Sequence, residues 1–248
     1  MKKYLFLLPI SLCTLLVQAQ YSGQALSNAS SGGSMDGSAA IINTLLGDMA
    51  SRDAKRTKNY DEFQGSPYVS NNFQKTNIWY NDENMGDMLY RYNALNEEIE
   101  IKNTNLEEEA ARSLARDKNI FVTIDGKKMG FKTFVTSKNK TVNGYLLNLL
   151  TGAKYDLYKR THVKFTEGKP APNSFVKAVP ARFSHFTEYY FQKNGVNRID
   201  EIPLSNGKLL KLLEGEDRAK VKTFLKENSI RIKDESDLIQ VFGFLNRT

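Results

Sequence analysis

Two histidines and the four acidic pairs that fall at predicted strand ends or turns are the side chains in this sequence that we consider for acid–base or metal chemistry. His162 and His185 are far apart in the chain, and both fall in stretches with strand-like alternation. The acidic pairs are Asp61-Glu62, Asp82-Glu83, Glu97-Glu98 and Asp200-Glu201. Glycoside hydrolysis uses two carboxylates that flank a cleft, so a carbohydrate-active hydrolase is one alternative. Each pair falls at a strand end or a turn, however, where charge usually means solvation.

No motif of a catalytic or metal centre supports that alternative. The chain has no HExxH or HxH spacing and no GxSxG, Walker A or GxGxxG sequence. Its single cysteine, Cys13, lies in the N-terminal apolar segment, so the remainder of the chain cannot use thiol catalysis, disulfides or cysteine metal sites. We therefore expect no catalytic residues, no metal and no cofactor, and we favour a non-enzymatic function.

A basic face that includes an aromatic residue is the best candidate for binding. In residues 153–165 the apolar side chains of Tyr155, Leu157, Val163 and Phe165 share one side of a predicted strand. The other side carries Lys154, Tyr158, Arg160, His162 and Lys164. This pattern predicts one buried and one wet face, and the wet face could bind an anionic ligand. An ordinary solvated sheet face is the simpler interpretation, because such faces also favour long basic side chains.

The N-terminal 19 residues predict a signal peptide that is removed on export. Lys2 and Lys3 precede an apolar run, and Val17 and Ala19 are small enough for cleavage after Ala19. A membrane anchor is the alternative, but the run is shorter than the roughly 20 apolar residues of a spanning helix and contains Pro9. We expect an exported protein of the periplasm or cell envelope, with no transmembrane span after cleavage.

The next two segments differ in composition from the rest. Residues 20–38 are rich in Ser, Gly and Ala and predict a flexible lead. Residues 39–58 predict an amphipathic helix, whose apolar side chains fall on one face. Those side chains are Ile41, Ile42, Leu45, Leu46 and Met49. This face could contact a membrane or a partner, although packing on the domain is the simpler expectation.

The main body divides into a β-rich part and a helical part. Residues 59–203 alternate with the period of strands, and Asp125-Gly126 predicts a tight hairpin turn. Residues 204–248 predict helices, with Ser205 and Asp234 as N-caps. We predict an α+β fold: a largely antiparallel β-meander, forming a curved sheet or partial barrel, with a C-terminal helical cluster packed on the sheet and an N-terminal helix.

The charge balance is mildly basic. The chain carries +7, and loss of Lys2 and Lys3 leaves +5. Anionic partners such as lipid head groups or polysaccharides are compatible with this charge. Nucleic acid is not an expected partner, because the chain is predicted to be exported and has no nucleic-acid-binding motif.

Three short stretches resemble exported proteins of unknown function that are common in Bacteroidota. They are Gly65-Ser66-Pro67-Tyr68, Leu89-Tyr90-Arg91-Tyr92-Asn93 and Glu97-Glu98-Ile99-Glu100-Ile101. The C-terminal stretches Lys226-Glu227-Asn228 and Asp237-Leu238-Ile239 add to the likeness, which covers about residues 62–247. The resemblance implies an envelope location and a single domain, and it assigns no catalytic or binding residue.

Three functions are therefore open. The leading hypothesis is a non-enzymatic envelope protein that binds a protein partner or an envelope component. A periplasmic carrier of a lipid or other apolar ligand is the first alternative, and it requires a large apolar pocket. The carbohydrate-active hydrolase is the second, and it requires two carboxylates at one cleft or both histidines beside an acid.

Overall fold

The computed structural model describes residues 63–173 and 175–248. All described residues belong to one compact unit, which lies within Ile42–Thr248. The predicted signal peptide (1–19), flexible lead (20–38) and amphipathic helix (39–58) lie outside the described residues.

The described residues form one ten-stranded sheet and three helices. The strands are β1 (Gln74–Tyr80), β2 (Glu83–Asn93), β3 (Glu98–Lys102), β4 (Arg112–Ser113), β5 (Ile120–Ile124), β6 (Lys127–Val135), β7 (Thr141–Leu150), β8 (Tyr155–Thr166), β9 (Arg182–Lys193) and β10 (Ile199–Ile202). Their order across the sheet is β10-β9-β8-β7-β6-β5-β1-β2-β3-β4. Nearly every pairing is antiparallel, so the predicted antiparallel α+β architecture is confirmed.

Strands β6 to β10 close into a ring. β10 pairs with β9 in an antiparallel ladder and also meets β6 at one parallel bridge, Asp200↔Val135. The carboxylate of Glu201 accepts a hydrogen bond from the Ser137 N–H at 2.7 Å beside this bridge. One end of the sheet is therefore a small barrel, and β5 and β1–β4 extend from it.

Local sequence accounts for the β5–β6 hairpin. Asp125 and Gly126 both have positive φ, at 48° and 76°, as the predicted tight turn requires. Asn194-Gly195 also forms a turn, but only Gly195 has a positive φ, and β10 starts four residues later at Ile199. That connection is a longer loop rather than a two-residue turn.

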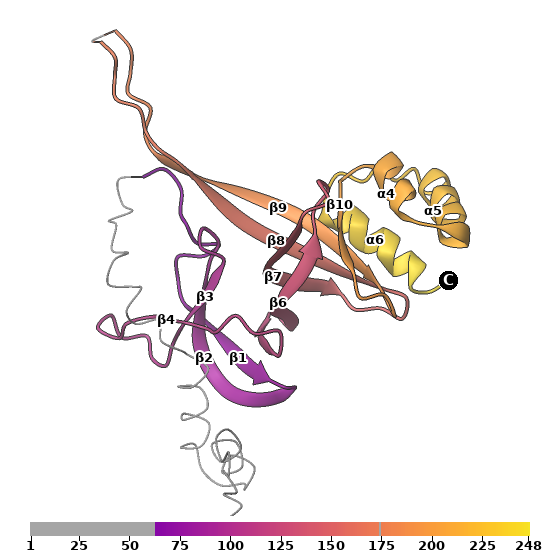
Figure 1. Ribbon diagram of the computed structural model, residues 1–248, viewed down its shortest axis with the longest axis horizontal. Coiled ribbons are helices and arrows are strands. Elements are labelled where there is room, and N and C mark those ends of the chain that lie inside the picture. The colour runs from indigo at the N-terminus through magenta and orange to yellow at the C-terminus, as the bar shows by residue number, and fades with distance from the viewer. Residues whose placement is uncertain (1–62, 174) are drawn as a thin grey trace, which may run out of the picture. The chain divides into compact units, whose positions relative to one another are not determined.

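Three C-terminal helices pack on one face of the ring: α4 (Asn206–Leu212), α5 (Gly215–Glu227) and α6 (Glu235–Leu245) (Figure 1). Asp234 caps α6 through the N–H groups of Ser236 and Asp237, as predicted. Ser205 occupies the N-cap position of α4, but its side chain makes no capping hydrogen bond. Buried side chains of the helices and of β7–β10 form one core, which includes Leu157, Phe191 and Phe242.

A second, smaller core fills the inside of the ring. It consists of Phe134, Leu146, Tyr158, Tyr190 and Ile199. Neighbouring residues of β8 and β9 therefore enter different cores, because consecutive side chains of a strand point to opposite faces. Both faces of β8 are buried near its N-terminal end: Leu157 is 0% exposed and Tyr158 is 3% exposed.

Candidate functional site

The five residues of the predicted basic face do not share one surface. Tyr158 is in the core of the ring, and the Arg160 side chain is only 15% exposed. Lys154 and Lys164 lie at opposite ends of β8, and Lys164 is exposed. The prediction of a continuous wet face is wrong, because closure of the ring places the centre of this face inside it. A role for these residues in binding an anionic ligand stays a prediction.

Arg160 is the centre of a half-buried ion cluster. Its Nη1 donates to Glu188 Oε2 at 2.8 Å, and its Nη2 and Nε donate to the carboxylate of Glu97. Burial disfavours the charged guanidinium, but the hydrogen bonds and charges of Glu97 and Glu188 outweigh burial and raise the pKa of Arg160. Both carboxylates are therefore occupied by the same cation.

Glu188 links a tyrosine and His162 to this cluster. Tyr190 donates its hydroxyl to Glu188 Oε2 at 2.7 Å, and His162 Nδ1 lies 3.9 Å from Glu188 Oε1. Burial opposes ionisation of Glu188, yet the hydrogen bonds from Tyr190 and Arg160 hold its pKa below the ordinary value. His162 Nδ1 is itself buried without a hydrogen-bond partner among the described residues, and its ring stacks on Phe186.

The two histidines do not converge. His162 is opposite Phe186 in the β8–β9 ladder, and Val163 is opposite His185. Directly opposed residues share a face, so the two histidines lie on opposite faces of the sheet. His185 Nε2 lies 2.8 Å from the carbonyl oxygen of Ser66. No group of three or more metal-ligating side chains is arranged to hold a metal within the described ranges.

The acidic pairs engage cations or backbone groups. Asp82 pairs with Lys128, Glu98 with Arg116 and Asp200 with Arg198, and Glu201 accepts from the Ser137 N–H. Asp61-Glu62 lies outside the described residues. Glu97 of the β2–β3 turn and Glu188 of β9 do come together, but Arg160 lies between them.

A pocket of about 140 Å³ lies on the face of β8 that is opposite to the Arg160 side chain. It is lined by Val69, Ser70, Asn72, Gln74, Tyr90, Arg91, Tyr92, Ile124, Met129, Leu147, Lys159 and Thr161. Met129, Leu147 and Lys159 form one row across β6, β7 and β8, since each is paired with the next. Residues of β1 and β2 form another wall. The curvature of the sheet therefore creates the pocket.

Most polar groups of the pocket have partners, but one hydroxyl does not. Tyr90 donates to Gln74 Oε1 at 3.1 Å, and Lys159 Nζ lies 2.9 Å from Glu235 Oε2. The hydroxyl of Tyr92 is buried and has no hydrogen-bond partner among the described residues, and burial raises its pKa. An unsatisfied buried hydroxyl is rare and unfavourable. The Tyr92 side chain lines the pocket, while its hydroxyl is enclosed and lies within reach of the charges of Glu97 and Arg160.

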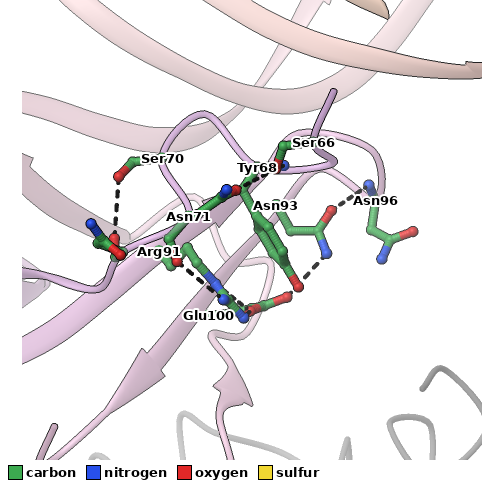
Figure 2. A network of polar contacts seen from close by, with 9 residues as sticks. Ser66, Tyr68, Ser70, Asn71, Arg91, Asn93, Asn96 and Glu100 are labelled. Atoms are coloured by element: carbon green, nitrogen blue, oxygen red, sulfur yellow. Dashed lines mark hydrogen bonds and ion pairs between the residues drawn. The ribbon is translucent and has the colours of Figure 1, made fainter. Parts of the chain in front are cut away.

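A network of polar contacts holds one rim of the pocket (Figure 2). Arg91 donates through Nε and Nη2 to Glu100 Oε2 at 3.1 and 2.5 Å, and Asn93 Nδ2 donates to Glu100 Oε1 at 3.0 Å. The Arg91 guanidinium also lies 3.8 Å from the ring centroid of Tyr68. These contacts fix residues 66–72, which contribute Val69, Ser70 and Asn72 to the pocket.

The network unites the three stretches that carry the resemblance to exported proteins. Tyr68, Arg91 and Glu100 belong to different stretches and meet in it. Sequence reasoning identified these stretches but missed the pocket beside them, because its lining comes from many separate segments. The alternation of Tyr90 and Tyr92 in the sequence was the one available signal, since it indicated that both share a strand face.

No family model, no curated protein and no solved structure matches this chain. No helix within the described residues is long and apolar enough to cross a bilayer. The function of this protein must therefore be inferred from the geometry of its own residues.

Proposed function

We propose that this protein is exported to the cell envelope and acts there as a non-enzymatic binding module. In this proposal the pocket on the curved sheet takes one small apolar or aromatic group of an envelope component. The observation that carries the proposal is the pocket itself, which is lined by apolar side chains such as Ile124, Met129 and Leu147 together with Tyr90 and Tyr92. A mostly apolar lining with few polar groups is typical of ligand sites.

The size of the pocket favours a small group over a whole lipid. Its volume is about 140 Å³. An apolar cavity of about 150 Å³ holds one benzene molecule, whereas pockets for drug-sized ligands measure roughly 300–1,000 Å³. A single ring or a short branched chain would fill it. The carrier hypothesis consequently receives less support than the binding module.

The carboxylates favour binding over hydrolysis. A glycosidase needs one carboxylic acid whose raised pKa keeps a proton available for the leaving group. Glu188 has a lowered pKa, and both Glu188 and Glu97 are bonded to Arg160. This pair is suited to holding a strand and a loop together rather than to transferring protons.

Native mass spectrometry of the protein purified from its own cell envelope tests the proposal. The wild type is compared with Val69→Trp, which places an indole at the rim of the pocket, and with Val196→Trp as control. Val69 and Val196 are similarly exposed, at 56% and 46%, and Val196 lies in the β9–β10 loop. We expect a discrete small-molecule adduct on the wild type and on Val196→Trp, and its loss from Val69→Trp.

Two results would contradict the proposal. One is a bare mass for the wild type together with no thermal stabilisation by a library of small aromatic and aliphatic compounds. The other is an adduct that Val69→Trp retains in full, which would place the ligand elsewhere. Turnover of a glycan by the purified protein, abolished by Glu188→Gln, would instead restore the hydrolase hypothesis.

A further inference from the structure

The β8–β9 hairpin extends beyond the strands beside it. Its ladder runs from Tyr155↔Lys193 to Thr166↔Arg182, whereas β7 pairs with β8 only as far as Lys159. Figure 1 shows the two strands continuing away from the helices into a narrow tip. We define the tip as residues 167–173 and 175–181.

The tip has a defined backbone. Lys169 and Val179 exchange two backbone hydrogen bonds, at 2.8 and 2.9 Å. A Cβ added at Gly168 would lie 2.8 Å from the carbonyl oxygen of Val179, so the two chains approach closely here. Pro170 and Pro180 lack N–H groups and prevent the ladder from continuing as a regular sheet edge. The two chains of the tip are therefore joined at its base, at the end of a long hairpin.

Exposed apolar side chains concentrate at this tip. Phe175 is 97% exposed, Val179 56% and Val176 49%. These are three of the nine large hydrophobic residues that are exposed in the described part of the chain. Solitary exposed hydrophobic residues need no explanation, but three within five residues at the end of a projection indicate a contact surface.

Positive charge surrounds these side chains. Residues 164–182 contain Lys164, Lys169, Lys177 and Arg182 against the single acidic residue Glu167, which gives +4 − 1 = +3. The three lysines are exposed, and none forms an ion pair within the described ranges. Exposed apolar side chains and exposed lysines on the same hairpin match the interface of an anionic bilayer, where the aromatic ring enters the head-group region and the ammonium groups meet phosphates.

We propose that the β8–β9 tip binds an anionic membrane surface, with Phe175 inserted and Lys169 and Lys177 on lipid phosphates. A bilayer fits this shape better than a protein partner does. A stable protein interface buries about 800 Å² on each side, which a narrow tip with three apolar side chains does not offer. This inference is independent of the pocket, since the tip and the pocket share no residue.

Vesicle co-sedimentation tests the inference on the protein in the form that its cells process and export. Binding should be strong to phosphatidylglycerol vesicles and weak to phosphatidylcholine vesicles. Phe175→Ser and the double variant Lys169→Glu/Lys177→Glu should each weaken binding by about tenfold or more. Leu106→Ser is the matched control, because Leu106 is 62% exposed but lies far from the tip in sequence, between β3 and β4, and it should bind as the wild type does.

A second readout places the ring in the bilayer. In Phe175→Trp, phosphatidylglycerol vesicles with brominated acyl chains should quench the added indole, whereas Trp79 of the wild type should keep its emission. Equal binding to both lipids, full binding by Phe175→Ser, or an unquenched Trp at position 175 would each overturn the inference. Capture of a protein partner by the wild type but not by Phe175→Ser, without vesicle binding, would assign the tip to that partner instead.

Discussion

Arg160 illustrates how one residue takes its role from its neighbours. The guanidinium is 15% exposed, and the Glu97 and Glu188 side chains around it are 21% and 26% exposed. At this depth two carboxylates that face each other repel strongly unless a cation lies between them. Arg160 supplies that cation and also lies 5.2 Å from the ring centroid of Phe134, so it joins polar and apolar parts of the ring.

Arg160→Met should lower the free energy of unfolding by roughly 3 kcal/mol, because the change leaves Glu97 and Glu188 half-buried without their cation. Arg198→Met is the control: Arg198 is 54% exposed in its pair with Asp200, and exposed ion pairs contribute about 0–1 kcal/mol. Urea unfolding measures both variants. Equal losses in the two would show that the Arg160 cluster behaves like a surface ion pair.

The lowered pKa of Glu188 predicts a pH dependence of stability. Burial alone would raise this pKa, but the hydrogen bonds from Tyr190 and Arg160 outweigh it. The stabilisation is complete above the ordinary glutamate pKa of about 4.3 and is lost as the pH falls through the lower folded-state value. Glu188→Gln should therefore be less stable than the wild type at neutral pH, and this difference should shrink as the pH falls below the ordinary glutamate pKa and through the lower folded-state value. Urea midpoints at several pH values measure it; a constant difference would contradict the assignment.

At the scale of elements, the end of α6 is attached to the turn between β7 and β8. Asn246 accepts from the N–H groups of Lys154 and Tyr155 at 2.9 and 2.8 Å, and its Nδ2 donates to the Tyr155 carbonyl oxygen at 2.9 Å. One amide side chain thus satisfies three backbone groups at the start of β8. Gly152 leaves room for it, since an added Cβ there would collide with the Asn246 side chain.

Asn246→Ala should reduce the free energy of unfolding by about 2 kcal/mol, because two half-buried N–H groups and one carbonyl lose their partner. Asn246→Asp keeps the two acceptor contacts and loses only the donor, so its loss should be smaller. Hydrogen exchange of the Lys154 and Tyr155 amides reports on the contact directly. Unchanged protection of these amides in Asn246→Ala would show that the helix end does not hold the turn.

At the scale of the whole described unit, β8 and β9 form a shared wall between two cores. Leu157 and Phe191 face the helices, and their neighbours Tyr158 and Tyr190 fill the ring. Phe242 of α6 lies on the helix side, with ring centroids 5.9 Å from Tyr155 and 5.8 Å from Phe191. Loss of packing on one side of this wall therefore affects the other side.

Phe242→Ala should cost about 3–5 kcal/mol, since Phe242 is fully buried, and the helices and sheet should still unfold together. Phe244→Ala is the matched control on the same helix; Phe244 is only half-buried and stacks on Phe224, so a smaller loss is expected. Far-UV circular dichroism and Trp79 fluorescence follow the two parts in urea. Separate transitions would show that the helical cluster folds independently of the sheet.

Much of the element pattern was predictable from local sequence, whereas the burial of β8 was not. The Asp125-Gly126 hairpin and the Asp234 cap followed from conformational rules that act over a few residues. The alternation in residues 153–165 correctly separated the two sides of β8. It could not show that both sides are buried at Leu157 and Tyr158, because that depends on β10 meeting β6. The pocket was hidden for the same reason, since its walls come from strands distant in the chain.

The sequence by itself determined where this chain turns, which residues share a strand face and where its last helix begins. These features depend on φ preferences, caps and periodicity, all of which are local. Only the tertiary structure decided that Arg160 would be enclosed between Glu97 and Glu188, that Tyr92 would line a pocket, and that Phe175 would remain exposed at a projecting tip. The reason is physical: burial and charge pairing depend on which strands, distant in the sequence, pair in the sheet, and local sequence patterns do not specify that pairing.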